Sequence, residues 1–168
     1  MRRYKILRIL YVITLSLLIS ILFRAPVVEA VRDMLTVLIY FLTPIIIKNY
    51  WCLIVGVLVP LLRFLIKLQV YNPTSVLFFI ILGDVSLISI SSLLYNKGRW
   101  VSFIGIILSS LTRFLVVSRS VSRLIDNHSN TYITSMNLLW FTILGGILAF
   151  IAIPQVEREI ETKNELYR

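Results

Sequence analysis

Residues that commonly carry catalysis or bind metals are scarce in this sequence. It contains one cysteine, Cys52, and one histidine, His128. A lone cysteine excludes an intramolecular disulfide and a cysteine-rich metal site, and a lone histidine in a polar stretch is typical of a solvated loop. The nucleophile motif GxSxG, the zinc motif HExxH and the Walker A phosphate loop are missing. We therefore expect no enzymatic activity and no cofactor, and any ATP hydrolysis that serves this protein must come from another chain.

Charged residues are also few. They make up 15% of the 168 residues, whereas 58% are hydrophobic and the mean hydropathy is +0.91. Apolar segments recur along the whole chain, which indicates an integral membrane protein with a single domain. The net charge is +9, but the basic residues stand singly at the ends of apolar segments. This placement is typical of membrane topology, so we expect a lipid bilayer around the protein and no nucleic-acid partner.

Hydrophobic runs predict six membrane-spanning helices, at residues 6–23, 34–47, 51–67, 74–94, 100–117 and 133–153. The second run is short, so part of residues 27–31 is expected to extend its helix. Pro154 is expected to end the last span, before a polar, helical tail at residues 155–168. The first span is preceded by basic residues that favour a cytoplasmic N-terminus, namely Arg2, Arg3, Lys5 and Arg8. The expected fold is an all-α integral membrane protein, a compact bundle of six transmembrane helices over residues 1–168. Both termini would be cytoplasmic, and the chain would cross a prokaryotic cell membrane.

The fourth run contains one charge, Asp84, near its middle. A carboxylate at that depth is costly unless it has a cationic partner, faces water or is protonated. Arg63 comes 12 residues after Trp51 and Arg113 comes 13 residues after Trp100. At about 1.5 Å per residue, both arginines lie roughly 18–20 Å from the inner interface, close to the level of Asp84. We predict that Asp84 pairs with Arg113 or Arg63. The alternative to a binding role is a structural ion pair that fixes helix packing.

Cations exceed anions in the half of the bundle expected to face outward. Arg63 and Lys67 are four residues apart and share a helix face, and Arg119 follows at the outer end of the fifth span. A guanidinium that Asp84 leaves free is expected to bind an anionic group there. The predicted solute site comprises Asp84, Arg63, Lys67, Arg113 and Arg119. For any single outer arginine, the alternative is a side chain that reaches lipid headgroups.

Small residues at helical spacing predict two close helix contacts. Ser16 and Ser20 lie four residues apart on one face of the first span, and Gly145 and Gly146 lie in the last span. The serine pair would pack either within the chain's own bundle or against a partner.

The whole-chain plan resembles the substrate-binding S components of energy-coupling factor (ECF) transporters, which capture vitamins and other micronutrients. The resemblance covers six short spans in under 200 residues, the basic start, the Ser16 and Ser20 pair, and the segments TPIIIKNYWCLIVGVLVPLLRFL, NPTSVLFFIILGD and ILGGILAFIAIP. It implies a solute-binding subunit whose ligand lies in the outer half, under loops from spans one, three and five. It also implies a coupling transmembrane subunit with two ATPase subunits, docked at Ser16 and Ser20, where the family usually has alanine. The first outer loop is shorter than the family's ligand lid.

Residue types favour a small anionic or zwitterionic solute but do not name it. A second function remains open, that of a non-transport membrane scaffold such as the small six-span subunit of the bacterial rod-elongation complex. The two functions differ in whether the polar groups converge on a ligand or face lipid and partner proteins.

Overall fold

Helices make up almost the whole of the described chain. The computed structural model describes residues 2–23, 29–47, 50–66, 75–95, 97–122 and 136–166, of which 97% are helical and none form strands. The elements, in chain order, are α1 (Arg2–Leu22), α2 (Glu29–Ile47), the 3₁₀ turn η2 (Tyr50–Cys52), α3 (Leu53–Leu65), α4 (Ser75–Tyr95), α5 (Arg99–Ser122) and α7 (Met136–Leu166). The prediction of an all-α chain is confirmed.

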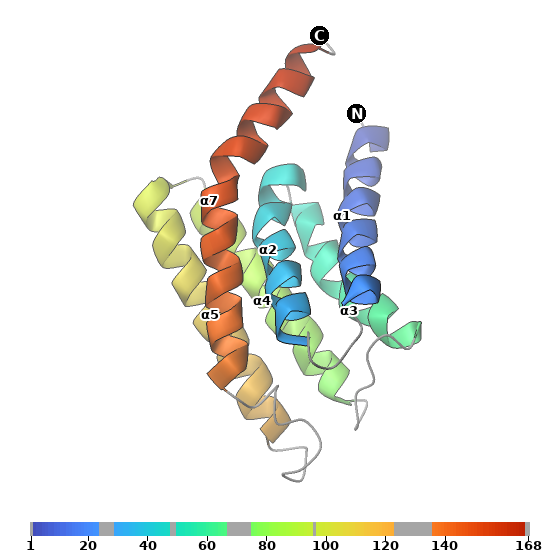
Figure 1. Cartoon of the computed structure of the whole chain (residues 1–168), viewed down its shortest axis with the longest axis vertical. Helices are drawn as coiled ribbons and strands as arrows, with labels where there is room; N and C mark the ends of the chain where they lie inside the picture. The colour runs from blue at the N-terminus through green and yellow to red at the C-terminus, as the bar shows by residue number, and fades with distance from the viewer. Residues whose placement is uncertain are drawn as a thin grey trace.

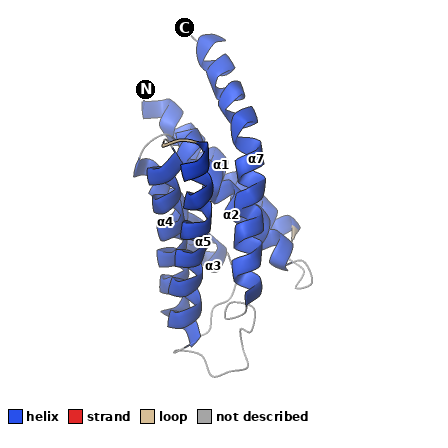
Figure 2. Cartoon of the chain, turned by 90° about the vertical axis from the view of Figure 1, so that its left-hand side faces the viewer, coloured by secondary structure: helices blue, strands red, loops and turns tan. Residues whose placement is uncertain are grey.

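The helices run up and down along a common direction (Figure 1). The start of α1 and the end of α7 lie at the same end of the bundle, which we call the terminal end, and α7 projects beyond its neighbours there. The opposite end is called the far end. α2 contacts α1, α3, α4 and α7, whereas α5 packs mainly beside α4, as seen from a second side in Figure 2. α2 is therefore the central helix of the bundle.

Within the described ranges, four helices are long and apolar enough to cross a membrane, by their length and composition. The stretches are Ala30–Ile47, Val76–Tyr95, Trp100–Ser118 and Met136–Ile160. Two further apolar stretches, Ile6–Leu22 and Tyr50–Leu65, are shorter. About 61% of the α2 stretch is buried against other helices, compared with 33% in α5 and α7, so the outer helices present apolar side chains to their surroundings. The chain is a membrane-embedded helical protein, and six full spans remain a prediction.

Several helix limits differ from those expected. α2 begins at Glu29, so residues 29–33 of the expected outer loop are helical, as the short second run allowed. α5 continues to Ser122, beyond the expected limit at residue 117.

Pro154 was expected to end the last span before a helical tail, and α7 in fact runs through Pro154 without a break to Leu166, so the tail is helical as far as the structure describes it. Pro44 and Pro60 likewise lie inside α2 and α3. A proline removes one helical hydrogen bond but already has a helical φ, and in a membrane the remaining backbone groups have no better partner than the helix itself.

Two apolar clusters lie one above the other in the bundle. The cluster toward the far end contains Val76 and Ile80 of α4 with Val117 of α5. The cluster toward the terminal end contains Leu87 and Ile88 of α4 with residues of α1, α2, α3 and α7. Asp84 falls between the two sets on α4. Buried polar groups therefore form a layer between two apolar ones.

Gly145 and Gly146 allow close approach, as predicted. A Cβ atom on Gly145 would lie 2.5 Å from the carbonyl oxygen of Met34, so α7 touches the backbone of α2 at this point. This contact lies one turn from the polar layer and fixes the position of α7 beside it.

Candidate functional site

A buried ion pair joins α4 and α5 in the polar layer. Asp84 is 2% exposed and Arg113 is 6% exposed. The Nε atom of Arg113 donates a hydrogen bond to Oδ1 of Asp84 at 2.7 Å, and Nη1 donates to Oγ1 of Thr142 on α7 at 3.0 Å. Of the two partners predicted for Asp84, the structure selects Arg113. Because Thr142 comes from α7, one guanidinium ties three helices together.

Gly83 explains why α4 and α5 can approach closely enough for this pair. A Cβ atom at this position would lie 2.6 Å from Cγ2 of Val117 and 3.4 Å from Cγ of Arg113. The aliphatic part of Arg113 therefore packs against Gly83, where a side chain would otherwise lie, and its guanidinium pairs with Asp84.

Arg63 occupies a different environment. It is 5% exposed near the end of α3, and its Nη2 atom donates to Oγ1 of Thr36 at 2.6 Å and to the carbonyl oxygen of Ser16 at 3.3 Å. The Thr36 hydroxyl in turn donates to the carbonyl oxygen of Arg32 at 2.8 Å. Both groups that Arg63 bonds are neutral, and its Nε atom is buried without a hydrogen-bond partner among the described residues. Its guanidinium therefore has spare donor capacity inside the bundle.

Tyr40 adds a second buried donor. This α2 residue is fully buried, and its side chain lies within electrostatic reach of Asp84, Arg63 and Arg113. Its hydroxyl interacts with the Asp84 carboxylate. Buried polar groups are normally bonded, so the Arg63 Nε atom, which has no partner among the described residues, marks a place that lacks an acceptor.

Arg32 falls between the first two predicted spans, residues 6–23 and 34–47, but it is helical. It lies in the first turns of α2 and is 5% exposed, because α2 begins earlier than the hydrophobic run suggested. Among the described side chains, the buried charged residues are Arg32, Arg63, Arg113 and Asp84.

The serine pair of the first span lies inside the bundle. Ser16 and Ser20 are 0% and 2% exposed, and their hydroxyls donate to the carbonyl oxygens of Val12 and Ser16. Their position matches the alternative of packing within the chain's own bundle and offers a partner no surface. The exposed side of α1 consists of larger apolar residues, Ile6, Leu7, Leu10, Tyr11, Leu18, Ile21 and Leu22.

Two predicted site residues cannot be placed beside the others. Lys67 lies outside the described residues, and the side chain of Arg119 on α5 is also outside them. The structure places three of the predicted site residues in one polar layer: Asp84, Arg63 and Arg113. Asp84 and Arg113 are partners, whereas Arg63 makes separate hydrogen bonds to α1 and α2. Thr36 and Thr142, which were not predicted from the sequence, complete the layer. Both are hydroxyl residues inside apolar runs, and that position could have marked them as buried polar groups.

The chemistry of the layer is that of charge recognition. Within the described ranges, no group of three or more histidine, cysteine, aspartate or glutamate residues could hold a metal ion. Guanidinium groups bind carboxylates and phosphates through paired N–H donors, so the donors around Arg63 suit an anion.

Comparisons with known proteins give no relative. No protein-family model matches the sequence, and neither a curated protein nor a solved structure matches it. The likeness to S components therefore stays a prediction from the sequence.

Proposed function

We propose that this protein is the membrane-embedded substrate-binding subunit of an ATP-driven micronutrient transporter. It binds a small anionic or zwitterionic solute in the half of the bundle away from the termini, and a coupling transmembrane subunit with two ATPase subunits supplies the energy for release. The likeness to ECF S components supports the class of protein, and the layer around Arg63 supports the charge of the solute.

The observation that carries the proposal is the state of the Arg63 guanidinium. It is buried, its hydrogen bonds go to neutral oxygens, and its Nε atom has no described acceptor. A buried cation whose hydrogen bonds go only to neutral oxygens is costly, so a carboxylate or phosphate of a solute placed against it would be bound strongly.

The Asp84–Arg113 pair directs the anion to Arg63. Asp84 neutralises Arg113 through the 2.7 Å bond and would repel a second carboxylate at that position. The hydrogen bonds of Arg63 go instead to Ser16 of α1 and Thr36 of α2. A solute with both charges could place its anionic group at Arg63 and its cationic group toward Asp84.

Bound ligand can be tested on the purified full-length chain. We expect mass spectrometry of the denatured sample to find a retained small anionic or zwitterionic solute, and we expect that solute to raise the melting temperature when added back. Arg63→Gln should lower retention by about tenfold or more, since it removes a charge-assisted hydrogen bond. Lys97→Gln, an exposed cation at the terminal end, is the matched control and should retain the solute.

Tyr40→Phe tests whether the Tyr40 hydroxyl contributes to solute binding. Its hydroxyl lies by the Asp84 carboxylate, so the substitution should lower solute affinity severalfold, and the melting temperature of the empty protein measures separately what the hydroxyl contributes to folding. An absence of retained solute, with no stabilisation by any vitamin or nucleobase-like compound, would reject the transport proposal and favour the membrane scaffold.

A further inference from the structure

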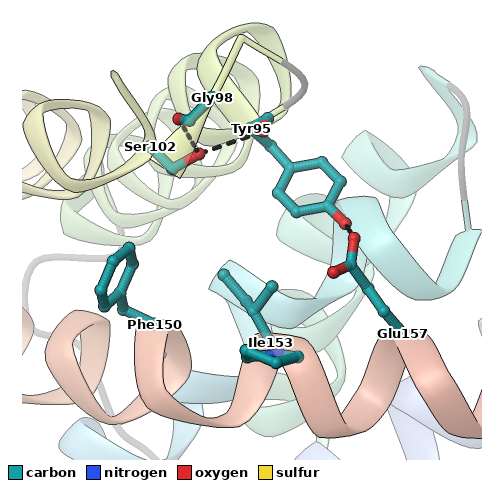
Figure 3. A pocket seen from close by; sticks show the side chains of 7 residues that line it. Tyr95, Gly98, Ser102, Phe150, Ile153 and Glu157 are labelled. Atoms are coloured by element: carbon teal, nitrogen blue, oxygen red, sulfur yellow. Dashed lines mark hydrogen bonds between the residues drawn. The ribbon is translucent and has the colours of Figure 1, made fainter. Parts of the chain in front are cut away.

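A pocket lies at the terminal end of the bundle, away from the buried charge layer. It has a volume of about 430 Å³ and is formed where α4 ends, α5 begins and α7 passes beside them (Figure 3). Its lining residues are Tyr95, Gly98, Ser102, Phe150, Ile153, Pro154 and Glu157. The volume is that of a site for a small organic molecule.

The polar side chains of this pocket have already used their hydrogen atoms. The Tyr95 hydroxyl donates to Oε1 of Glu157. The Ser102 hydroxyl lies 3.0 Å from the carbonyl oxygens of both Tyr95 and Gly98, and it donates its one hydrogen to this pair (Figure 3). A hydroxyl whose hydrogen is bonded offers only lone pairs, and a carboxylate offers nothing else. The side-chain polar groups therefore present acceptors to a ligand.

The remaining walls are apolar and partly aromatic. Phe150 and Ile153 project from α7 toward the ends of α4 and α5, with Phe150 on the Ser102 side of the pocket and Tyr95 on the Glu157 side (Figure 3). The ring of Phe150 is held edge-to-face by Phe103 at a centroid distance of 5.8 Å. Aromatic faces next to a carboxylate favour a cation that carries an apolar body.

Glu157 is the one charged residue among those that line the pocket. Its cationic neighbours Lys97 and Arg158 are exposed, so both can extend their charged ends into water. Glu157 therefore supplies the charge that the lining residues present to a ligand, and that charge is negative.

We propose that this pocket binds an organic ammonium ion with an apolar body. The ammonium group donates to the carboxylate of Glu157 and to the Ser102 oxygen, and the apolar body lies against the rings of Tyr95 and Phe150. The site differs in charge and position from the anion site at Arg63 and does not depend on it.

Three probes of matched shape test this site on the full-length protein in lipid nanodiscs. The probes are 2-phenylethylamine, 2-phenylethanol and 3-phenylpropanoate, which carry a cationic, a neutral and an anionic head. By isothermal titration calorimetry we expect saturable binding of the amine, binding of the alcohol at least about tenfold weaker, and no binding of the acid. Equal binding of all three probes would show apolar partitioning and overturn the proposal, as would no binding of the amine to folded protein.

Substitution locates the binding. Glu157→Gln should weaken amine binding by about tenfold or more, because a neutral amide replaces the carboxylate. Glu159→Gln, at an exposed position two residues further along α7, is the matched control and should bind the amine as the unaltered chain does. If Glu157→Gln keeps full affinity, or if both variants lose it equally, the ammonium site is not at Glu157. The comparison of probes on the unaltered chain decides the proposal even if a variant fails to fold.

Discussion

At the scale of single residues, Asp84 and Arg63 share one buried layer but differ in how their charges are compensated. Asp84 has a guanidinium partner at 2.7 Å, whereas Arg63 bonds to a threonine hydroxyl and a backbone carbonyl. The first arrangement suits a structural role and the second suits a binding role. From the sequence both roles are open for Asp84, and its close pair with Arg113 favours the structural one.

Asp84→Asn should destabilise the protein strongly. It leaves Arg113 buried without its counter-charge, which costs about 3–5 kcal/mol in the free energy of unfolding. The double variant Asp84→Asn with Arg113→Met removes both charges and should recover part of that loss. Denaturant titration in mixed micelles measures these differences.

Ser86→Ala is the control for this pair, since the Ser86 hydroxyl bonds only within its own helix, to Leu82, and should change stability by less than about 0.5 kcal/mol. Additive losses in the double variant would show that the two charges do not act as a pair. If Asp84→Asn left both folding and solute retention unchanged, Asp84 would have neither the structural role nor the binding role.

At the scale of elements, the α4–α5 contact depends on the absence of a side chain at Gly83. The stem of Arg113 and the methyl groups of Val117 occupy the space that a Cβ atom would need. Helices in a membrane gain association energy from this kind of close packing, since lipid is as apolar as their own side chains.

Gly83→Ala should lower stability by about 1–3 kcal/mol through overpacking against Val117. Adding Val117→Ala removes the methyl group that lies 2.6 Å from the new Cβ atom and should restore part of the loss. Leu82→Ala, on the exposed side of the same turn, is the control and should cost less. Thermal unfolding followed by circular dichroism gives the ranking, and a fully tolerated Gly83→Ala would contradict the observed packing.

At the scale of the whole molecule, both ends of the chain lie at one end of the bundle (Figure 1). This arrangement requires an even number of membrane crossings, and the predicted six spans meet that condition. Among the residues that the structure describes, four helices meet the length and composition expected of a full span, so α1 and α3 need a direct test.

Cysteine labelling tests this topology. In a Cys52→Ala background, we expect Lys97→Cys and Thr162→Cys at the terminal end to react with an impermeant maleimide only after the cells are permeabilised. Ile66→Cys at the far end should react from outside intact cells, because it is exposed beyond the end of α3. Labelling of all three positions from the same side would contradict six crossings.

Much of the architecture could be predicted from the chain, but the site could be predicted only in part. Hydrophobic runs located every helix of the described chain, with differences at the ends such as the start of α2 at Glu29 and the end of α5 at Ser122. The number of residues from the membrane interface predicted one common depth for Asp84, Arg63 and Arg113, because the rise per residue is constant in a helix. It could not choose between the two arginines, since that choice depends on how each helix is rotated about its axis.

The sequence by itself determined a helical membrane protein with a buried carboxylate that needs a cation, because hydropathy and helix rise are local properties that each segment carries alone. Only the tertiary structure decided that Arg113 is the partner, that Arg63 keeps spare donors beside Tyr40, that the serines of α1 face inward, and that an acidic aromatic pocket opens at the terminal end. These features depend on the rotation and offset of neighbouring helices. Those are set by side-chain packing between segments far apart in the chain, at contacts such as Gly83 against Val117 and Gly145 against Met34.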